Sequence, residues 1–286
     1  MRDVTYGMAN KQDRPYLQAI FSKSFPGTAA ELALMLDEWE RMELPLPVGR
    51  IAGVPRAMLL ALPITVRLGR KEYTGRYLYG VATHPDCRRQ GLASGLLEYT
   101  HQWMKENKEQ FSILLPDSDK NRRFYEKCGY RTCGARAWLP YTDTAAAELP
   151  LHKATPEAYA ALRRTLCGDA MLWGAEGIRL QEKWLHLYGG ALWLLGEPEA
   201  PWGCAATSAE EDGSTRVREL LCPDHLRGAS LHALCHRLGV RGLDCCVPEN
   251  TAKPLGVPVM PGAMLYGTGL ESVWQGEHLY CALTME

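Results

Sequence analysis

Apolar positions along the first half of the chain alternate between helical and strand-like spacing. Residues 29–41 carry large apolar side chains at the i, i+3, i+4 and i+7 spacing of an amphipathic helix, and Pro45 and Pro47 follow as breakers. Apolar runs predict strands at 57–68, 77–83 and 111–115, and helical spacing predicts helices at 93–105 and 121–128. This order predicts an α/β fold, a mixed sheet with flanking helices and a crossover connection.

The pattern lapses between Tyr141 and Lys153, which predicts a boundary between domains of residues 1–145 and 150–286. Thr155 and Pro156 then have the residue types of an N-cap and a first helical turn. The second half repeats the order of the first, with strands at 191–195, 203–208 and 216–221, a helix at 229–238 and a strand at 243–247. Its turn at 223–230 keeps the Pro-Asp of the turn at 85–93, so we interpret the two halves as a diverged internal duplication.

Composition narrows the class of protein. With 286 residues and 46% apolar content, the chain can bury two medium-sized cores. A formal net charge of −1 argues against a protein that wraps nucleic acid or is drawn to an anionic membrane. The first 15 residues lack the apolar core of a signal peptide, and the longest apolar runs are far too short to span a membrane. These features predict a cytoplasmic protein with neither a nucleic-acid nor a membrane partner.

The ten cysteines have neither the spacing of a disulfide scaffold nor that of a familiar zinc motif. Cys204 and Cys281 fall in apolar, strand-like runs, so free buried thiols are expected. His232, Cys235 and His236 share one helical turn, which leaves a zinc-dependent structural protein as an alternative. Because the spacing matches no known ligand pattern, buried cysteines and amphipathic histidines are favoured, and no metal is expected.

The turn at 88–93, Arg-Arg-Gln-Gly-Leu-Ala, lies where a predicted strand leads into a predicted helix. Unpaired amides at a helix start and the positive end of the helix dipole both favour an anion. Gly91 allows the backbone to approach that anion closely, and Ala93 is too small to block it. A diphosphate fits such a turn, and an ordinary solvated turn is the alternative interpretation.

Together with a second segment, this turn resembles the GNAT superfamily of acyl-CoA N-acyltransferases. Residues 88–93 fit the family signature of Gln or Arg, two variable residues, Gly, one variable residue, then Gly or Ala. Residues 121–130, Asn-Arg-Arg-Phe-Tyr-Glu-Lys-Cys-Gly-Tyr, are similar to the family motif on the acceptor side of the CoA site. Two motifs in the right order are more specific than either alone. The motifs span about Tyr77 to Tyr130, and the fold-level resemblance covers Met1 to Tyr141.

The resemblance implies acetyl-CoA as co-substrate and gives roles to particular residues. Tyr125 would be the general acid, and Asn121, four residues earlier on the same helical face, would flank the pantetheine. A half-buried helix tyrosine and an asparagine N-cap are the structural alternatives. The backbone of a strand would pair with the pantetheine arm at Val81, Ala82 and Thr83. The turn would hold the pyrophosphate through Arg88, Arg89, Gln90, Gly91, Leu92, Ala93 and Ser94.

The chemistry of amine acylation needs these parts. An amine that attacks a thioester gives a tetrahedral oxyanion, which a strand amide such as that of Val81 or Thr83 can stabilise. The leaving thiolate has a pKa close to that of cysteine, so a tyrosine with a pKa of about 10 can protonate it.

The general base stays open. The strand at 77–83 presents Tyr77, Tyr79 and Val81 on one face, and no carboxylate. The layout resembles the enhanced intracellular survival type of N-acetyltransferase, whose base is the C-terminal carboxylate of a third, sterol-carrier-like domain. This chain ends at Glu286 without room for that domain. The base is therefore Glu286, or none is used and the amine arrives deprotonated.

The second turn departs from the signature. It has one residue fewer between Pro and Gly, with His225 where Arg or Gln is expected and Ser230 where Gly or Ala is expected. We therefore expect a degenerate GNAT-like domain that does not bind CoA and that walls the acceptor pocket.

The function expected from these residues is acetyl-CoA-dependent transfer of an acetyl group to a primary amine of a small molecule, by direct attack. Nothing in the sequence opposes a homo-oligomer. The alternative from another class is a non-catalytic acyl-CoA-binding or sensing protein, because the strand lacks a carboxylate base.

Overall fold

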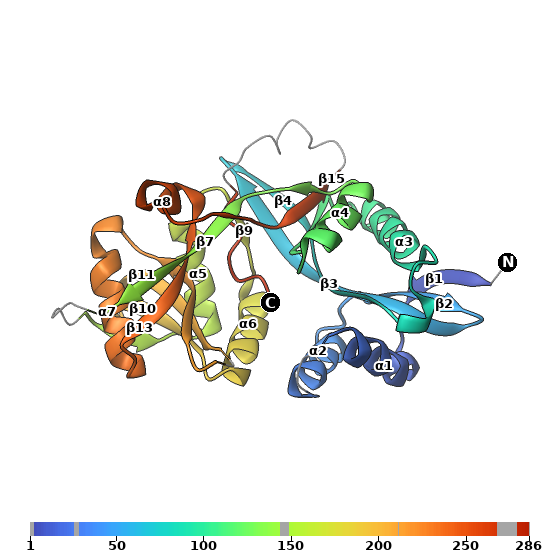
Figure 1. Ribbon diagram of the computed structural model, residues 1–286, viewed down its shortest axis with the longest axis horizontal. Coiled ribbons are helices and arrows are strands. Elements are labelled where there is room, and N and C mark those ends of the chain that lie inside the picture. Colours follow the sequence, from blue (N-terminus) through green and yellow to red (C-terminus); the bar gives the residue numbers. More distant parts are fainter. Residues whose placement is uncertain (1–2, 26–28, 144–148, 211, 268–278, 286) are drawn as a thin grey trace. The chain divides into compact units, whose positions relative to one another are not determined.

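The computed structural model describes residues 3–25, 29–143, 149–210, 212–267 and 279–285. The chain divides into two compact units, each built around its own sheet (Figure 1). The first unit is drawn from Met1–Thr65, Tyr73–Arg131 and Met264–Ser272, and the second from Val66–Glu72, Thr132–Ala263 and Val273–Glu286. The boundary predicted between residues 145 and 150 falls mostly outside the described residues.

In the first unit a mixed sheet is covered by helices on both faces. The strands along this sheet are β1 (Val4–Met8), β2 (Pro47–Ile51), β3 (Val54–Leu68), β4 (Lys71–Thr83), β5 (Phe111–Leu114), β6 (Arg131–Thr132) and β15 (Met264–Gly267), and β9 (Ala170–Leu172) also pairs with β3. They follow the order β1-β2-β3-β4-β5-β15-β6. The helices are α1 (Arg14–Ser24), α2 (Ala29–Arg41), α3 (Leu92–Glu106) and α4 (Asp119–Lys127). In Figure 1, α1 and α2 lie on one side of this sheet, and α3 and α4 lie on the other.

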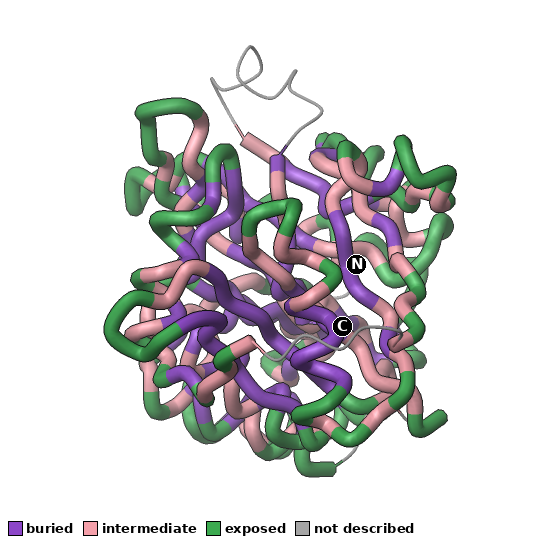
Figure 2. The backbone as a smooth tube through the Cα atoms, turned by 90° about the vertical axis from the view of Figure 1, so that its left-hand side faces the viewer, coloured by how far each residue is buried: buried purple, intermediate pink, exposed green. Residues whose placement is uncertain are grey.

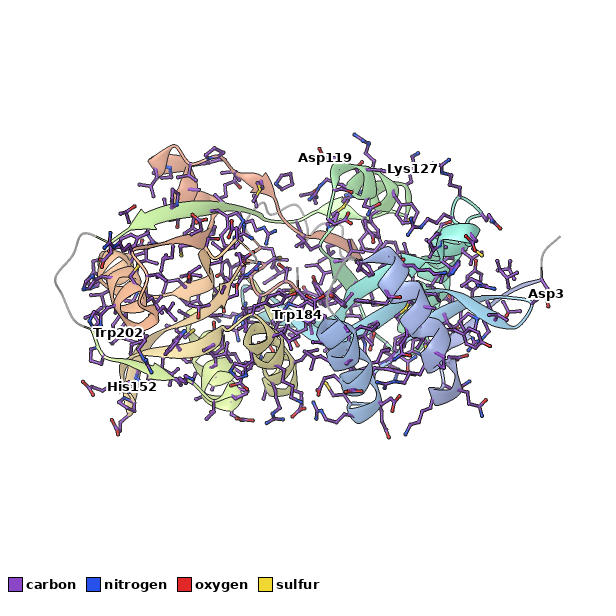
Figure 3. The ribbon with its side chains drawn as sticks, turned by 60° about the horizontal axis from the view of Figure 1, so that its bottom comes forward. Asp3, Asp119, Lys127, His152, Trp184 and Trp202 are labelled. Carbon is purple, nitrogen blue, oxygen red and sulfur yellow. The ribbon has the colours of Figure 1, made fainter. Side chains whose placement is uncertain are left out.

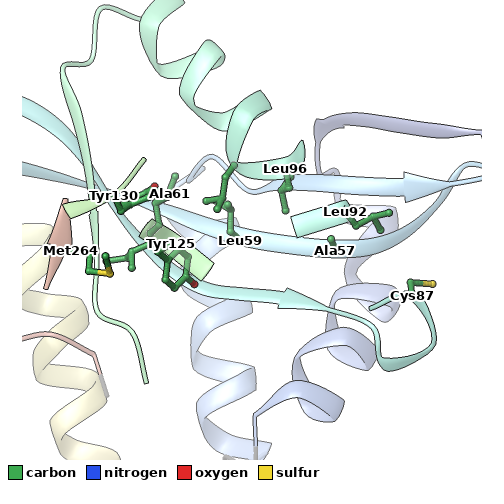
Figure 4. Packing of buried hydrophobic residues seen from close by; sticks show 12 residues of the cluster. Ala57, Leu59, Ala61, Cys87, Leu92, Leu96, Tyr125, Tyr130 and Met264 are labelled. Atoms are coloured by element: carbon green, nitrogen blue, oxygen red, sulfur yellow. The ribbon is translucent and has the colours of Figure 1, made fainter. Parts of the chain in front are cut away.

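The amphipathic pattern of α3 explains its position on the sheet. Its buried residues include Leu92, Leu96 and Leu97, which pack on Leu59 and Leu78 of the sheet. Figure 4 shows this cluster, and Figure 2 shows buried residues in the interior with exposed residues around them. Because α3 connects β4 to the parallel strand β5, it is the predicted crossover helix.

The second unit has the same plan. Its strands are β7 (Ala135–Thr142), β8 (Leu151–Lys153), β9 (Ala170–Leu172), β10 (Ala191–Glu197), β11 (Ala200–Ala209), β12 (Thr215–Leu221), β13 (Gly242–Pro248) and β14 (Met260–Pro261). Its sheet follows the order β14-β7-β13-β12-β11-β10-β8, and β9 lies outside it. The helices are α5 (Pro156–Leu166), α6 (Ala175–Leu187), α7 (Arg227–Leu238) and α8 (Glu249–Ala252). Again the crossover helix, α7, connects two parallel strands, β12 and β13.

Each sheet contains a strand from the other half of the sequence. β15, from near the end of the chain, pairs antiparallel with β5, where Leu265 aligns with Ile113. β7, which the sequence pattern did not predict as a strand, pairs antiparallel with β13 over seven positions, from Gly242↔Thr142 to Pro248↔Arg136. If the chain were divided between residues 143 and 149, the first half would lose β15, the neighbour of β5, and the second half would lose β7, the neighbour of β13.

Most predicted elements are confirmed. The helix expected at 29–41 has those bounds, and the helix expected from 93 spans Leu92–Glu106. Thr155 is the N-cap of α5, since its side chain accepts a hydrogen bond from the Ala158 amide at 3.2 Å. Gly129, just past the end of α4, has a positive φ, +88°. Cys204 is buried in β11, but Cys281 is half-buried and lies in no strand.

Candidate active site

The pairing of β4 with β5 ends well before β4 does. The two parallel strands align at Gly75↔Phe111, Arg76↔Ser112 and Tyr77↔Ile113, and β4 then runs six residues further, to Thr83. Within this free stretch Gly80 has φ +63°, a conformation that L side chains rarely adopt. A left-handed residue inside a strand bends it and re-aims its edge. The predicted residues Val81, Ala82 and Thr83 therefore lie on a strand edge that β5 leaves open.

The predicted anion-binding turn follows directly, as a 3-10 helix (Pro85–Cys87) and then residues 88–91 before α3. Arg89 has φ +60° and Gly91, the N-cap of α3, has φ +79°. Two left-handed residues within three positions fold the backbone so that neighbouring amides converge on one concave side. Gly91 makes no side-chain cap bond, so the first amides of α3 have no acceptor within the helix.

The side chains of the turn bond back to their own backbone. Arg88 Nε donates to the Thr83 carbonyl at 3.1 Å, and Gln90 Nε2 donates to the Asp86 carbonyl at 3.3 Å. Ser94 Oγ donates to the Gly91 carbonyl at 2.9 Å. Leu92 is buried in the core, so only its amide is available to a ligand. The arrangement presents backbone N–H groups, while Arg88 and Gln90 hold the turn in shape.

Two residues that the sequence did not single out border the turn. His84 is buried at the end of β4, and its Nε2 lies 3.1 Å from Lys23 Nζ on α1. Burial and then the Lys23 charge lower the pKa of His84, so it is neutral near pH 7. On the other side of the ring, Nδ1 accepts a hydrogen bond from the Asp86 amide at 3.4 Å and lies 3.7 Å from the Asp86 carboxylate. Lys23 thus adds a cation beside the turn, which no pattern within 77–94 could indicate.

Tyr125 lies in the core on the α3 side of the sheet, 8% exposed. Its ring packs edge-to-face against Phe124 and Tyr130, with centroids 5.2 and 5.6 Å away. In Figure 4 its hydroxyl points away from Tyr130 and Met264. Burial first, and then the Asp117 charge, raise the pKa of this phenol above the usual value. Tyr125 therefore keeps its proton across the working pH range.

Asn121 does not cap its helix. Ser118 is the N-cap of α4, and its Oγ accepts a hydrogen bond from the Asn121 amide at 3.3 Å. The Asn121 side chain donates to Asp117 Oδ1 at 2.7 Å. Figure 3 marks the two ends of α4 with Asp119 and Lys127. The N-cap interpretation is wrong because α4 begins two residues earlier than the apolar pattern predicted, so Asn121 lies inside its first turn.

A buried polar network supports α4 and β5. The Tyr130 hydroxyl lies 2.8 Å from Ser112 Oγ and 2.9 Å from His101 Nε2. Tyr266 of β15 stacks on the His101 ring, so the late strand covers the network. Burial lowers the pKa of His101 to about 4.

The corresponding turn of the second unit is built differently. A 3-10 helix (Asp224–Leu226) runs straight into α7, and Arg227 is right-handed helical. No residue from 222 to 230 has a positive φ, and Arg227 pairs with the Asp224 carboxylate. This turn therefore forms no concave row of amides, and its Arg227 is already paired with a carboxylate.

The described residues contain no group of three His, Cys, Asp or Glu side chains placed to hold a metal ion. His232 Nδ1 instead bonds Asp143 Oδ1 at 2.5 Å. All ten cysteines are free thiols. Of the helices that the structure describes, none combines the length and the hydropathy needed to cross a membrane.

Comparisons with known proteins agree with this geometry. Residues 8–133 match the family profile described as an acetyltransferase (GNAT) domain. A comparison with curated protein sequences finds no match. Among solved structures, a probable N-acyltransferase from Enterococcus faecalis V583 is 13% identical with a TM-score of 0.76, covering 95% of this chain and 74% of that one.

Two further structures share the two-unit layout. Eis1 from Mycobacterium abscessus is 14% identical with a TM-score of 0.67, over 94% of this chain and 74% of that one. A tandem GNAT protein from the clavulanic acid biosynthesis pathway is 13% identical with a TM-score of 0.54, over 93% and 99%. At these identities the likeness shows the fold.

The fold is of the α/β class, with two related sheets in tandem. Residues 8–133, which are less than half of the chain's 286 residues, match the GNAT family of acetyltransferases. The expected GNAT fold and tandem layout are confirmed.

Proposed function

We propose that the first unit binds acetyl-CoA between β4 and β5 and transfers the acetyl group to a primary amine of a small molecule. One observation carries the proposal. The open edge of β4 leads directly into the turn with left-handed Arg89 and Gly91. A ligand fits this order of features if its extended arm carries amide groups, which would lie along the strand edge, and if it ends in a diphosphate, which would lie at the turn.

The residues divide the work of binding. The backbone of Val81, Ala82 and Thr83 hydrogen-bonds the pantetheine amides, in the manner of an added strand. The amides of Arg89 through Ser94 hold the diphosphate, with Arg88 and Lys23 supplying positive charge at the border. Asn121 is held by Asp117 through its amide nitrogen, so its carbonyl oxygen is left for the pantetheine. Acetyl-CoA supplies an activated thioester.

Tyr125 is the proposed general acid. Among the described residues no hydrogen bond to its hydroxyl is recorded, and the hydroxyl is directed away from Tyr130 (Figure 4). A phenol with a raised pKa is a weaker acid than tyrosine in water. The CoA thiolate that receives the proton would form next to this buried hydroxyl. Poor solvation there would raise the pKa of the thiol as well. The pKa difference between the Tyr125 phenol and the CoA thiol is thus smaller than the raised pKa of the phenol alone suggests.

The base remains one of two options. The face of β4 that bears Tyr77, Tyr79 and Val81 carries aromatic and aliphatic side chains. Glu286 lies outside the described residues. An amine that enters deprotonated needs no base on the protein. Activity would then rise with pH up to the pKa of the amine, and its midpoint would change with the acceptor.

Calorimetry with acetyl-CoA, combined with a free-thiol assay over a panel of primary amines, tests the proposal. Binding together with thiol release on at least one amine supports it. Binding without thiol release on any amine favours the second candidate, an acyl-CoA sensor, which the absence of a carboxylate on β4 between residues 77 and 83 supports. No binding of acetyl-CoA contradicts both.

A further inference from the structure

The first strand of the first unit, β1, is the end strand of its sheet and lacks the features that protect sheet ends. At the other ends of the two described strand orders, the end strands are two or three residues long and contain a charged residue or a proline: Arg131 in β6, Lys153 in β8 and Pro261 in β14. β1 has five residues, Val-Thr-Tyr-Gly-Met, without a charge, a proline or a register shift. An unprotected end strand of this kind is a template for pairing with another chain.

The register of β1 on β2 shows which of its backbone groups face outward. The Ala52 amide donates to the Asp3 carbonyl at 3.0 Å, just before the first pair of the register. Because bonded and non-bonded positions alternate in an antiparallel pair, odd-numbered residues of β1 turn their N–H and C=O groups toward β2, and even-numbered residues turn theirs away. The described part of the chain supplies no partner for the outward groups of Val4 and Tyr6. The outward carbonyl of Met8 accepts a hydrogen bond from a guanidinium of β2 at 3.3 Å.

This outer edge is complementary to itself in the antiparallel direction. A two-fold axis at Tyr6 would place Tyr6 opposite its own copy, and Val4 opposite Met8 of the other copy on each side. All of these residues face outward, so the opposed pairs could exchange backbone hydrogen bonds. Beyond both ends of the strand, the same axis would bring Asp3 of one copy toward Lys11 of the other. Both side chains are exposed, and neither has an ion-pair partner in the part of the chain that the structure describes.

The surface beside this edge leaves room for more of a second copy than one strand. A groove of about 780 Å³ lies along α3 next to β1, and its lining includes Tyr6, Gly95, Glu98 and Tyr99. The Tyr6 hydroxyl lies directly against Gly95, and the Tyr6 ring stacks on Tyr99 with centroids 6.4 Å apart. Strand pairing over five residues covers only about 17 Å, which by itself buries less surface than a stable dimer does. A copy related by an axis perpendicular to the sheet brings its own α3 to the same face, where this helix can fill the groove.

We propose that β1 pairs antiparallel with β1 of a second copy of this chain, and that the first-unit sheets of the two copies form one continuous sheet. The outward N–H and C=O groups of each β1 are satisfied by the other copy. On the face that bears α3, the two Tyr6 rings lie side by side at the axis, and Val4 of each copy packs on Met8 of the other. The assembly is closed at two copies because the contact uses the same strand twice.

Sedimentation equilibrium of the full chain, over a series of protein concentrations, tests the proposal. We expect a monomer–dimer equilibrium for the natural chain. Val4→Pro removes the outward N–H of residue 4 from both copies and should raise the dissociation constant at least about tenfold. Val4→Thr, the matched control, keeps this N–H and a β-branched side chain, so its dissociation constant should stay close to that of the natural chain. A natural chain that is monomeric up to its solubility limit, or equal dissociation constants for the two variants, overturns the proposal.

Hydrogen exchange on the natural chain locates the contact without relying on a variant that has to fold. Mass spectrometry compares amide exchange at protein concentrations above and below the dissociation of the dimer. The amides of residues 4–8 should exchange more slowly in the dimer, whereas those of residues 151–153 in β8, the end strand of the other sheet, should exchange at the same rate in both states. Unchanged exchange at β1 on dimerisation, or slower exchange at β8 alone, contradicts the proposed contact.

Discussion

The imidazole of His101 on α3 stacks on the phenol of Tyr266 on β15, with ring centroids 3.7 Å apart and planes 4° apart. This contact joins β15 to α3, the helix that follows the turn proposed to bind the diphosphate. Tyr266→Ala should lower the free energy of unfolding by about 2 kcal/mol, because it removes aromatic packing from a half-buried site. Tyr266→Phe should keep the stack and most of the stability. Equal urea midpoints for the two variants would contradict this role.

His101 also makes stability depend on pH. Its pKa in the folded protein is about 4, lowered by burial, against about 6.5 in an unfolded chain. The unfolded state therefore binds a proton that the folded state does not, so stability falls as pH drops from about 6.5 to about 4. The full effect is about 3 kcal/mol.

His101→Gln should remove this contribution from the pH dependence. The difference in unfolding free energy between the natural chain and the variant should narrow or reverse in sign as pH falls through that window. Subtracting the two curves cancels the separate effect of His84, whose pKa is lowered in the same direction. A pH-independent difference would show that His101 does not titrate in this range.

Tyr125→Phe tests the proposed general acid. We expect kcat to fall by roughly 10²–10⁴-fold with little change in the KM for acetyl-CoA, because only proton donation is lost. Tyr16→Phe makes the same change at a 46% exposed position on α1 and should leave kcat unchanged. If the kcat of Tyr125→Phe equals that of the natural chain, Tyr125 is not the general acid.

Gly91→Ala tests the turn through its backbone. Open space surrounds the added methyl group, whose nearest neighbour would be Ser94 Oγ at 4.0 Å. Any loss of stability therefore comes from the backbone, because alanine rarely adopts φ +79°. We expect a loss of about 1 kcal/mol in stability and a raised KM for acetyl-CoA.

Gly228→Ala is the matched substitution in the second turn. Gly228 lies in α7 without a positive φ and with nothing within 4 Å of the added group. It should be neutral or stabilising by up to about 1 kcal/mol, with no effect on acetyl-CoA. Identical behaviour of the two glycine variants would contradict the assignment of the diphosphate site to the first turn.

A buried ion pair sets the stability of the second unit. Arg163 Nε donates to Glu219 Oε2 at 2.9 Å, the Tyr159 hydroxyl donates to the same oxygen at 2.8 Å, and both charged side chains are at most 1% exposed. Glu219→Leu leaves a buried guanidinium and should cost about 3–5 kcal/mol. The double variant Arg163→Met with Glu219→Leu should recover much of that loss in thermal unfolding. A double variant less stable than the single one would contradict this account.

The sequence predicted the local parts of this protein better than the pairing between them. Hydrophobic spacing located α2, α3 and β4, because these elements bury one face or the whole strand. It also located the turn at 88–93 before α3, because its glycine and arginines lie within four residues of one another in the sequence.

Long-range features had no local signal. The pairing of β15 with β5 depends on residues far apart in the chain, and Ala135–Thr142 alternates too weakly to predict a strand. Lys23 reaches the turn only through the packing of α1. One local signal was overlooked: Gly80 interrupts an apolar strand, as glycines at strand bulges do.

The exchange of strands between the sheets affects the order in which the chain can fold during synthesis. Domains usually fold as they emerge from the ribosome, the N-terminal one first. Here β5 gains its neighbour β15 only after Met264–Gly267 has been made, when nearly all of the second unit already exists. Until then the edge of β5 stays open to wrong partners. The emerging first unit therefore carries an unpaired strand edge until the second unit has been made.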